Sequence, residues 1–409
     1  MLIIRGNNLP RVKASNQSAI REIIYHYGPI TRTEIAERLS LTLPTITTTI
    51  NNLISKGLIC EIDNPDETSK SIGRKASLID IVTDAKFFLG IEMRGSLRRL
   101  CLLNYRGRVL GSVKDDTAFT DYDEDIAFTC QLAKKLIDET GLPKEKIYGI
   151  GICLPGLVDT EEGILKMHPG YKWRSKNVKS DLARLMEYSG AISVENNACA
   201  RAFGAQLFHQ DLVNNAPSFA YLYISTGIAC PLMINGTNFY GSIAGLGETG
   251  HMVMDVNGPL CVCGNRGCLE AFSSERAIID SCIKEIENGG ADILQGMCAD
   301  PSAPTIDEIL AAQKAGDVNV CKIIESAIFY LGVAIANIEN FIWPHTMLIE
   351  GNLLRENSNR TKLLKVIYKN LYSTTIEDVR FEFMETDDFS GAKGAAAVAI
   401  RRELETYIE

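Results

Sequence analysis

The sequence predicts an α/β protein in two parts, an N-terminal winged helix-turn-helix head and a larger, two-lobed α/β body. Helical periodicity fills most of the N-terminal part of the chain. Apolar, β-branched runs then alternate with amphipathic helices, and this alternation starts a second time in the later half of the chain. We therefore expect the head over residues 1–82, lobe I over 83–195 completed by a C-terminal helix at about 388–409, and lobe II over 196–387.

The composition is that of a soluble globular protein. With 409 residues, 46% of them hydrophobic and 23% charged, the chain is long enough for two or three domains. No run approaches the roughly 18 uninterrupted apolar residues of a membrane span, and the N-terminus lacks a secretory apolar segment. The 12 cysteines fit a reducing compartment better than a disulfide framework. We expect a cytoplasmic protein without a membrane partner.

The net charge of −9 is unevenly distributed. Residues 1–82 carry ten Lys and Arg against eight Asp and Glu, a net +2, which leaves −11 for the remainder. A weakly basic head on an acidic body permits contact with DNA by the head only.

The head begins with two predicted helices. Apolar residues recur at helical spacing over 16–27, and Gly28 with Pro29 then ends the helix. Thr31 is placed to cap a second helix, and Glu34 stands three positions later, which is the spacing of a capping box.

A third helix is predicted over 44–58, with Pro44 in its first turn. Its apolar residues share one face, since Ile46, Ile50 and Leu53 follow at i, i+4 and i+7. Turning this face inward leaves short polar side chains outward, where they can reach base edges or phosphates in a major groove. These candidate DNA-binding residues are Thr45, Thr48, Asn51 and Asn52.

Two short strands follow, at 58–63 and 76–81, joined by a polar loop that ends in Gly73, Arg74 and Lys75. This loop would be the wing, and Arg74 and Lys75 would contact DNA, with Arg74 suited to a narrow minor groove. An alternative stays open, in which the head is a small helical unit for protein interaction and its threonines are merely solvated.

The body is predicted as two repeated α/β units. The expected elements of the first unit are strands at 86–93, 98–105, 108–113 and 147–156 and a helix at 123–141. Those of the second are strands at 218–225 and 346–351 and a helix at 319–341, and a final helix at 390–408 follows. Ligands of such proteins bind between the lobes.

One segment of the second unit carries four soft metal donors, His251, Cys261, Cys263 and Cys268. Three thiolates and one imidazole complete the tetrahedral shell of Zn²⁺ and leave no position for water, so we expect a structural zinc. Interleaved glycine and proline residues let the backbone wrap closely around one ion. The alternative is chance clustering of reduced thiols.

The stretch GETGHMVMDVNGPLCVCGNRGCLEAFSS, at 247–274, resembles the zinc signature of the ROK family (repressor, open reading frame, kinase). That family contains bacterial sugar kinases and sugar-responsive repressors. The resemblance implies an actin-like, ribonuclease H-like ATPase fold for the two lobes. It also implies sugar contacts by Asn196, Glu248, His251 and Glu270, with His251 using one ring nitrogen for zinc. Alternatively, Glu248 and Glu270 steady the zinc ligands or cap helices.

Two positions of the kinase chemistry implied by the resemblance are altered here. The kinases carry an aspartate, two glycines and a hydroxyl residue as their first phosphate motif, and the matching stretch is 92–96, where Arg94 replaces a glycine. Their catalytic aspartate follows an asparagine, whereas Asn196 is followed by Asn197. An amide cannot accept the proton of a sugar hydroxyl, and such a loss lowers the rate about a hundredfold to ten-thousandfold.

The second glycine-rich phosphate turn of the kinases is also altered, since Ala229 and Pro231 stand where the kinases have glycine. Gly351 and Asn352 still resemble the turn on the nucleotide side, which leaves room for residual nucleotide affinity. The two altered phosphate-binding motifs and the missing catalytic aspartate together argue against an enzyme.

We therefore expect a sugar-responsive, DNA-binding transcriptional regulator without catalytic residues. It would be a repressor of carbohydrate-utilisation genes, bound to operator DNA as a homodimer or tetramer and tuned by a sugar between the lobes. Glucose, N-acetylglucosamine and xylose share the hydroxyls that the expected contacts recognise, and His168 and Trp173 are candidates for the mouth of the pocket. Two alternatives stay open: an ATP-dependent ROK sugar kinase with a DNA-binding head, and a regulator controlled by a protein that docks near the zinc knuckle.

Overall fold

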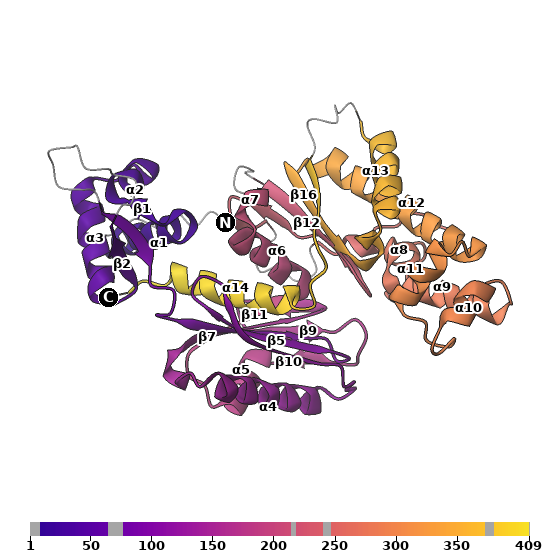
Figure 1. Cartoon of the computed structure of the whole chain (residues 1–409), viewed down its shortest axis with the longest axis horizontal. Coiled ribbons are helices and arrows are strands. Elements are labelled where there is room, and N and C mark those ends of the chain that lie inside the picture. The colour runs from indigo at the N-terminus through magenta and orange to yellow at the C-terminus, as the bar shows by residue number, and fades with distance from the viewer. Residues whose placement is uncertain (1–8, 64–76, 214–217, 240–246, 373–379, 409) are drawn as a thin grey trace.

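The chain forms a small head beside a body of two lobes (Figure 1). Helix α14 (Ser390–Glu405) lies between the sheet of lobe I and helix α6 (Asn197–Phe208), and it also contacts the head. The wing residues Arg74 and Lys75 lie outside the described part of the chain. The computed structural model describes residues 9–63, 77–213, 218–239, 247–372 and 380–408.

The head has the predicted three helices and antiparallel sheet, with strand order β1-β3-β2. Thr31 and Glu34 form the predicted capping box at the start of α2. The first helix starts at Leu9, earlier than the predicted start at residue 16. Pro10 does not prevent this start, because proline is tolerated in the first turn of a helix. Strand β1 was not predicted, because two residues carry no alternation. The elements are α1 (Leu9–Tyr27), β1 (Ile30–Thr31), α2 (Arg32–Leu39), α3 (Leu43–Ser55), β2 (Ile59–Ile62) and β3 (Leu78–Ile81).

Lobe I is a five-stranded sheet of order β11-β7-β4-β5-β6, covered by α4 and α5 on one face and by α14 on the other. The predicted strands and helix are confirmed within a few residues. Its elements are β4 (Phe87–Met93), β5 (Arg98–Asn104), β6 (Val109–Asp115), α4 (Tyr122–Thr140), β7 (Ile147–Leu154), α5 (Val178–Met186) and β11 (Ala191–Asn196). A turn η1 (Lys144–Lys146) precedes β7, and a small sheet adds β8 (Leu157–Asp159), β9 (Ile164–Met167) and β10 (Arg174–Lys176).

Helix α14 approaches the sheet of lobe I very closely. A Cβ atom on Gly90 would lie 1.9 Å from the carbonyl oxygen of Ala392, and one on Gly151 would lie 1.8 Å from that of Ala395. Only glycine therefore fits at these two strand positions. The other side of α14 packs against α6 (Asn197–Phe208), which contacts strand β12 of lobe II.

Lobe II has the strand order β15-β14-β12-β16-β17, and β13 also pairs with β12. Strands β12 and β16 are parallel, as are β16 and β17. The strands are β12 (Ser218–Ile224), β13 (Ile228–Ala229), β14 (Leu232–Ile234), β15 (Thr237–Asn238), β16 (Thr346–Gly351) and β17 (Arg380–Phe383). The helices are α7 (Gln210–Val213), η2 (Thr249–His251), α8 (Glu270–Ser273), α9 (Glu275–Glu287), α10 (Asp292–Met297), α11 (Ile306–Lys314), α12 (Val318–Ile342), η3 (Asn352–Arg355) and α13 (Asn357–Asn370).

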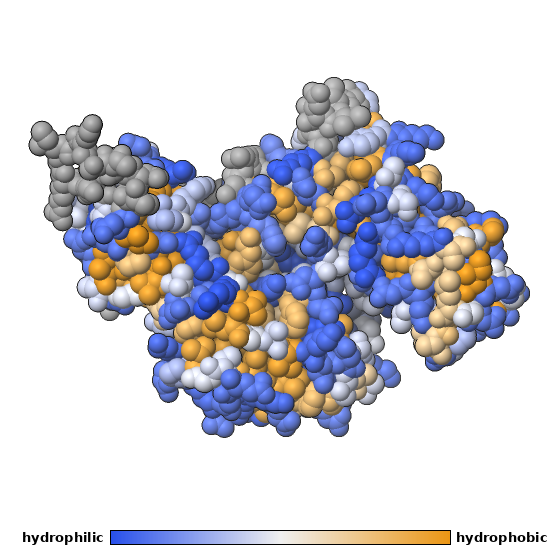
Figure 2. Space-filling model, viewed as in Figure 1, coloured by the Kyte–Doolittle hydropathy of each residue, from blue (hydrophilic) through white to orange (hydrophobic). Residues whose placement is uncertain are grey.

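Among the described residues, one helix, α12, is long and apolar enough to cross a membrane by length and composition. It lies inside lobe II, where Ile324, Leu331 and Ile335 are fully buried in the core. The surface is hollowed between lobe I and the helical part of lobe II (Figure 2).

The head and lobe I share one hydrophobic core, which contains Ile20 and Ile46 of the head together with Phe88 and Leu404 of the body. Beside this core, the buried carboxylate of Glu403 forms ion pairs with Arg21 of α1 and Lys86 of lobe I. The head is therefore docked on the body by a buried, charged contact, which no local sequence pattern predicted.

The Glu403 contact can be tested by Glu403→Gln, which leaves Arg21 and Lys86 buried without a counter-charge. We expect the opening free energy of α1 to fall by about 3–5 kcal/mol, measured by hydrogen exchange of its backbone amides. The control Glu405→Gln changes a more exposed pair with Arg401 on the same helix. Its effect should stay below about 1 kcal/mol, and equal effects of the two variants would contradict this role of Glu403.

Candidate functional site

The four predicted metal ligands come together in lobe II. The ligand atoms of His251, Cys261, Cys263 and Cys268 all lie within 4.8 Å of one another. Two of the spacings are 3.7 Å, from Cys261 Sγ to His251 Nδ1 and from Cys263 Sγ to Cys268 Sγ. A tetrahedron with Zn–S bonds of about 2.3 Å has edges of about 3.8 Å. The cluster therefore has the donor types and the spacing of a site that could hold a metal ion.

The loop that carries these cysteines needs glycine to fold. Gly267 has a φ of +69°, and a Cβ atom there would lie 1.5 Å from the carbonyl oxygen of Asp255. Short bridges pair Val253 with Cys268 and Leu260 with Arg266, which closes the loop on itself. The sequence thus brings the three thiols together by local turns, as the predicted knuckle requires.

Three of the predicted sugar contacts gather beside the metal cluster. Glu248 precedes η2, which ends at His251, while Glu270 opens α8. Burial and the neighbouring Glu270 raise the pKa of Glu248 to about 7. The carboxylate of Glu270 accepts a hydrogen bond from Arg276 at 2.8 Å. Because His251 turns Nδ1 toward the thiols, its Nε2 is the nitrogen left for another partner.

Asn196, the fourth predicted sugar contact, has a structural task in the described residues. Its Oδ1 accepts a hydrogen bond from the backbone N–H of Ala198 at 2.8 Å, which caps α6, and its Nδ2 donates to the carbonyl of Gly156 at 3.0 Å. The cap fixes where the first turn of α6 stands. Oδ1 also accepts from the backbone N–H of Cys199 at 3.4 Å, so a sugar hydroxyl would instead accept from the second N–H of Nδ2.

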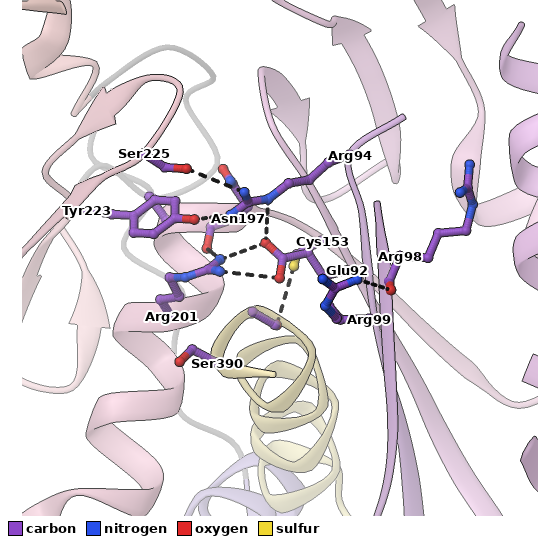
Figure 3. Close-up of polar contacts among 12 residues, drawn as sticks. Glu92, Arg94, Arg98, Arg99, Cys153, Asn197, Arg201, Tyr223, Ser225 and Ser390 are labelled. Carbon is purple, nitrogen blue, oxygen red and sulfur yellow. Dashed lines mark hydrogen bonds and ion pairs between the residues drawn. The ribbon is translucent and has the colours of Figure 1, made fainter. Parts of the chain in front are cut away.

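Arg94 and Asn197 lie close together where the two lobes meet (Figure 3). Arg94, just after β4 of lobe I, donates from Nε to Glu92 at 2.9 Å. It also reaches into lobe II, where Nη1 lies 3.4 Å from the hydroxyl of Ser225 and Nη2 bonds to the hydroxyl of Tyr223. Arg94 thus makes a direct contact between the lobes.

Arg201 of α6 continues this network. Its guanidinium binds both carboxylate oxygens of Glu92, at 2.9 and 3.2 Å, and its Nε lies 3.2 Å from Glu350 of β16. Burial opposes ionisation of Glu92, but Arg201 and Arg94 outweigh it and lower its pKa to about 2. Tyr221 completes the set by donating to Glu350 at 2.6 Å.

Sequence reasoning missed Arg201 and Glu350. The available signal was an isolated charge inside an apolar strand, which both Glu92 in FFLGIEM and Glu350 in TMLIEG provide. Such a charge is rarely buried without a partner. Arg201 gives no comparable signal, because an arginine within a helix is most often solvated.

His168 and Trp173, expected at the mouth of the pocket, are packed in an aromatic cluster instead. Both are buried, and Trp173 stacks on Tyr171 with ring centres 4.8 Å apart. Burial lowers the pKa of His168 to about 4. The aromatic residues of this loop thus form core packing of lobe I.

On the head, α3 exposes the predicted polar face. Thr48, Asn51 and Asn52 are exposed, while Thr45 is half-buried and pairs its hydroxyl with Thr42 at 2.9 Å. Arg32, which was not singled out in the sequence, lies 3.4 Å from Asn51 Oδ1 and forms an ion pair with Glu61 of β2. It ties the exposed helix to the sheet.

Comparison with known proteins supports both halves of this description. A family model described as "ROK family" matches residues 88–402, and one described as "MarR family" matches 15–67. The xylose repressor of Bacillus subtilis (strain 168) is 26% identical over 374 residues, covering 88% of this chain and 89% of the repressor. The DNA-binding transcriptional dual regulator NagC of Escherichia coli (strain K12) is 27% identical over 413 residues, covering 97% and 95%.

The fold of the whole chain also has a counterpart among solved structures. A ROK family transcriptional regulator, described as a homolog of the E. coli MLC protein, superposes with a TM-score of 0.81 at 25% identity. The match covers 96% of this chain and 97% of that one, so the head and both lobes are included. The predicted fold, a helix-turn-helix head on a ROK body, is confirmed. Because the ROK model spans well over half of its length, this chain belongs to the ROK family.

Proposed function

We propose that this protein is a sugar-responsive transcriptional repressor, in which the head binds operator DNA and the body binds the sugar. The observation that carries this proposal is the union of a MarR-type head and a ROK body around one shared hydrophobic core. Motion of lobe I is then transmitted directly to the DNA-binding helix. The similarity to repressors over nearly the whole chain supports the same function. A DNA-bound regulator of this kind acts in the cytoplasm, as a homodimer that reads two half-sites.

The sugar would bind beside the metal cluster, against Glu248, Glu270 and the free Nε2 of His251. Carboxylates accept hydrogen bonds from hydroxyl groups, and an array of such acceptors suits a polyol. A Zn²⁺ ion held by His251 and the three cysteines would supply structural cross-linking of this loop. The two relatives named above have nearly equal sequence identity to this chain, and only one of them is named a xylose repressor. Xylose is therefore one of several candidate sugars.

The geometry of the phosphate region supports a regulator over a kinase. Asn197 cannot act as a general base for a sugar hydroxyl. Arg94 places its guanidinium against Ser225 and Tyr223 of lobe II, across the position where the resemblance places a nucleotide's phosphates. Phosphoryl transfer depends on positioning the nucleotide, and this region has neither the base nor an open cradle.

The central test is a mobility-shift assay with DNA from the gene's own upstream region. We expect a specific shift that D-xylose, D-glucose or N-acetyl-D-glucosamine changes at millimolar concentration. A coupled ADP-release assay on the same preparation should show no turnover above background. A specific shift that no monosaccharide alters would contradict the sugar-responsive part, and steady ADP release would contradict the regulator itself.

The exposed face of α3 can be tested by Asn52→Ala. If Asn52 reads a base edge, its loss should weaken specific DNA binding by about 1–3 kcal/mol, which corresponds to a fivefold or larger rise in Kd measured by fluorescence anisotropy. Asn370→Ala, at an exposed asparagine of lobe II, is the matched control and should leave the Kd unchanged. Equal Kd values for the two variants would exclude Asn52 from the DNA interface.

The metal cluster can be tested by Cys263→Ser. We expect the purified wild-type protein to contain one zinc per chain by elemental analysis, and the variant to contain much less, since a hydroxyl is a poor zinc ligand. Sugar affinity should fall in the variant, because Glu248 and Glu270 flank the loosened loop. Cys298→Ser, outside the cluster, is the control. A wild-type protein free of metal would refute the zinc assignment.

A further inference from the structure

Arg94 of lobe I bonds to Glu92 of its own lobe and to two hydroxyl groups of lobe II. Arg94 follows the last residue of β4, and its partners Tyr223 and Ser225 stand at the end of β12 (Figure 3). The guanidinium therefore joins the carboxyl ends of one strand from each lobe.

The charges of this network balance among themselves. Glu92 lies between Arg94 and Arg201, and Arg201 lies between Glu92 and Glu350. Two guanidinium groups thus face two carboxylates, and Glu92, Arg201 and Glu350 are each more than nine-tenths buried. Each guanidinium therefore has a carboxylate partner within the protein, as a buried charge requires.

The N-terminus of α14 adds a further favourable contact. A Cβ atom on Gly391, in its first turn, would lie 2.2 Å from the Glu92 carboxylate, so a larger residue there would push this carboxylate away from the helix end. The positive end of a helix dipole stabilises a carboxylate. Glu92 is therefore held from both sides, by the arginines and by the helix.

We propose that Arg94 and Arg201 form a latch that holds the two lobes closed without a nucleotide, and that the sugar effector acts on this latch. The latch comprises Glu92, Arg94, Arg201, Glu350 and the hydroxyls of Tyr223 and Ser225. In this arrangement the side chain of Arg94 is a built-in cation that bridges the two phosphate-binding turns. This regulatory role rests on the sugar response proposed above.

The first turn of α6 connects the sugar region to the latch. Asn196 caps this helix, and the carbonyl of Asn197 accepts a hydrogen bond from Arg201 at 3.2 Å. A hydroxyl bound to Asn196 would therefore fix the turn that aims Arg201. A sugar that binds between the lobes favours the closed state, and the latch favours the same state.

The test compares Arg94→Met, which keeps length and removes charge, with Arg99→Met. Arg99 pairs with Asp116 within lobe I, so the control removes an ion pair that does not cross between the lobes. In sugar-free protein we expect Arg94→Met to speed amide exchange at 92–96 and 223–227, and to enlarge the radius of gyration in X-ray scattering. If Arg94→Met leaves only about a tenth of the molecules closed, the apparent Kd of this variant for the sugar should be about tenfold higher than that of the wild type. Because Arg94→Lys keeps the positive charge, this variant should lie between the wild type and Arg94→Met in amide exchange, radius of gyration and sugar affinity.

Two results would overturn the latch. One is an Arg94→Met protein that matches Arg99→Met in exchange, scattering and sugar affinity. The other is a wild-type protein in which magnesium AMPPNP protects 92–96 and 223–227 from exchange, since a nucleotide would then enter the place assigned to the guanidinium. Exchange and scattering do not involve DNA, so these outcomes are independent of whether the head binds an operator.

Discussion

The structure depends on the close approach of α14 to the strands of lobe I. Gly90 and Gly151 have no side chain, so the backbone of α14 at Ala392 and Ala395 lies directly on the sheet. Helix α6 packs on the opposite side of α14. Because these surfaces consist of glycine and alanine, the backbones lie at their closest distance and have almost no freedom to slide. This contact sets the distance between Glu92 on the sheet and Arg201 on α6, and with it the geometry where the lobes meet.

We propose that buried charge separates this body from a phosphoryl-transfer enzyme of the same fold. An enzyme of this kind keeps a cavity in which the substrate supplies phosphates and a metal ion supplies positive charge. Here the guanidinium groups and carboxylates are covalently part of the chain, and they satisfy one another. Removing one partner would leave an uncompensated buried charge, so the network acts as a unit.

Features encoded by neighbouring residues could be predicted from the sequence. The capping box at Thr31 and Glu34, the strands of the body and the cluster from His251 to Cys268 all lie within short segments with their own periodicity or turn residues. Contacts between distant segments could not. The ion pair of Arg21 with Glu403 joins residues 382 positions apart, and nothing local separates either from a solvated charge. Asn196 could be placed by resemblance, but its capping bonds follow only from the position of α6.

Helix α1 and the residues that follow α14 contact each other in the folded protein. The side chain of Gln17 bonds to the backbone of Ile408, and α14 supplies part of the core on which α1 packs. The core that the head shares with lobe I is completed only when α14 has been synthesised. On the ribosome, the core of lobe II can close before α14 emerges, whereas the core shared by the head and lobe I cannot. A nascent or C-terminally clipped protein therefore exposes isoleucines of the head, which makes it a substrate for chaperones and proteases.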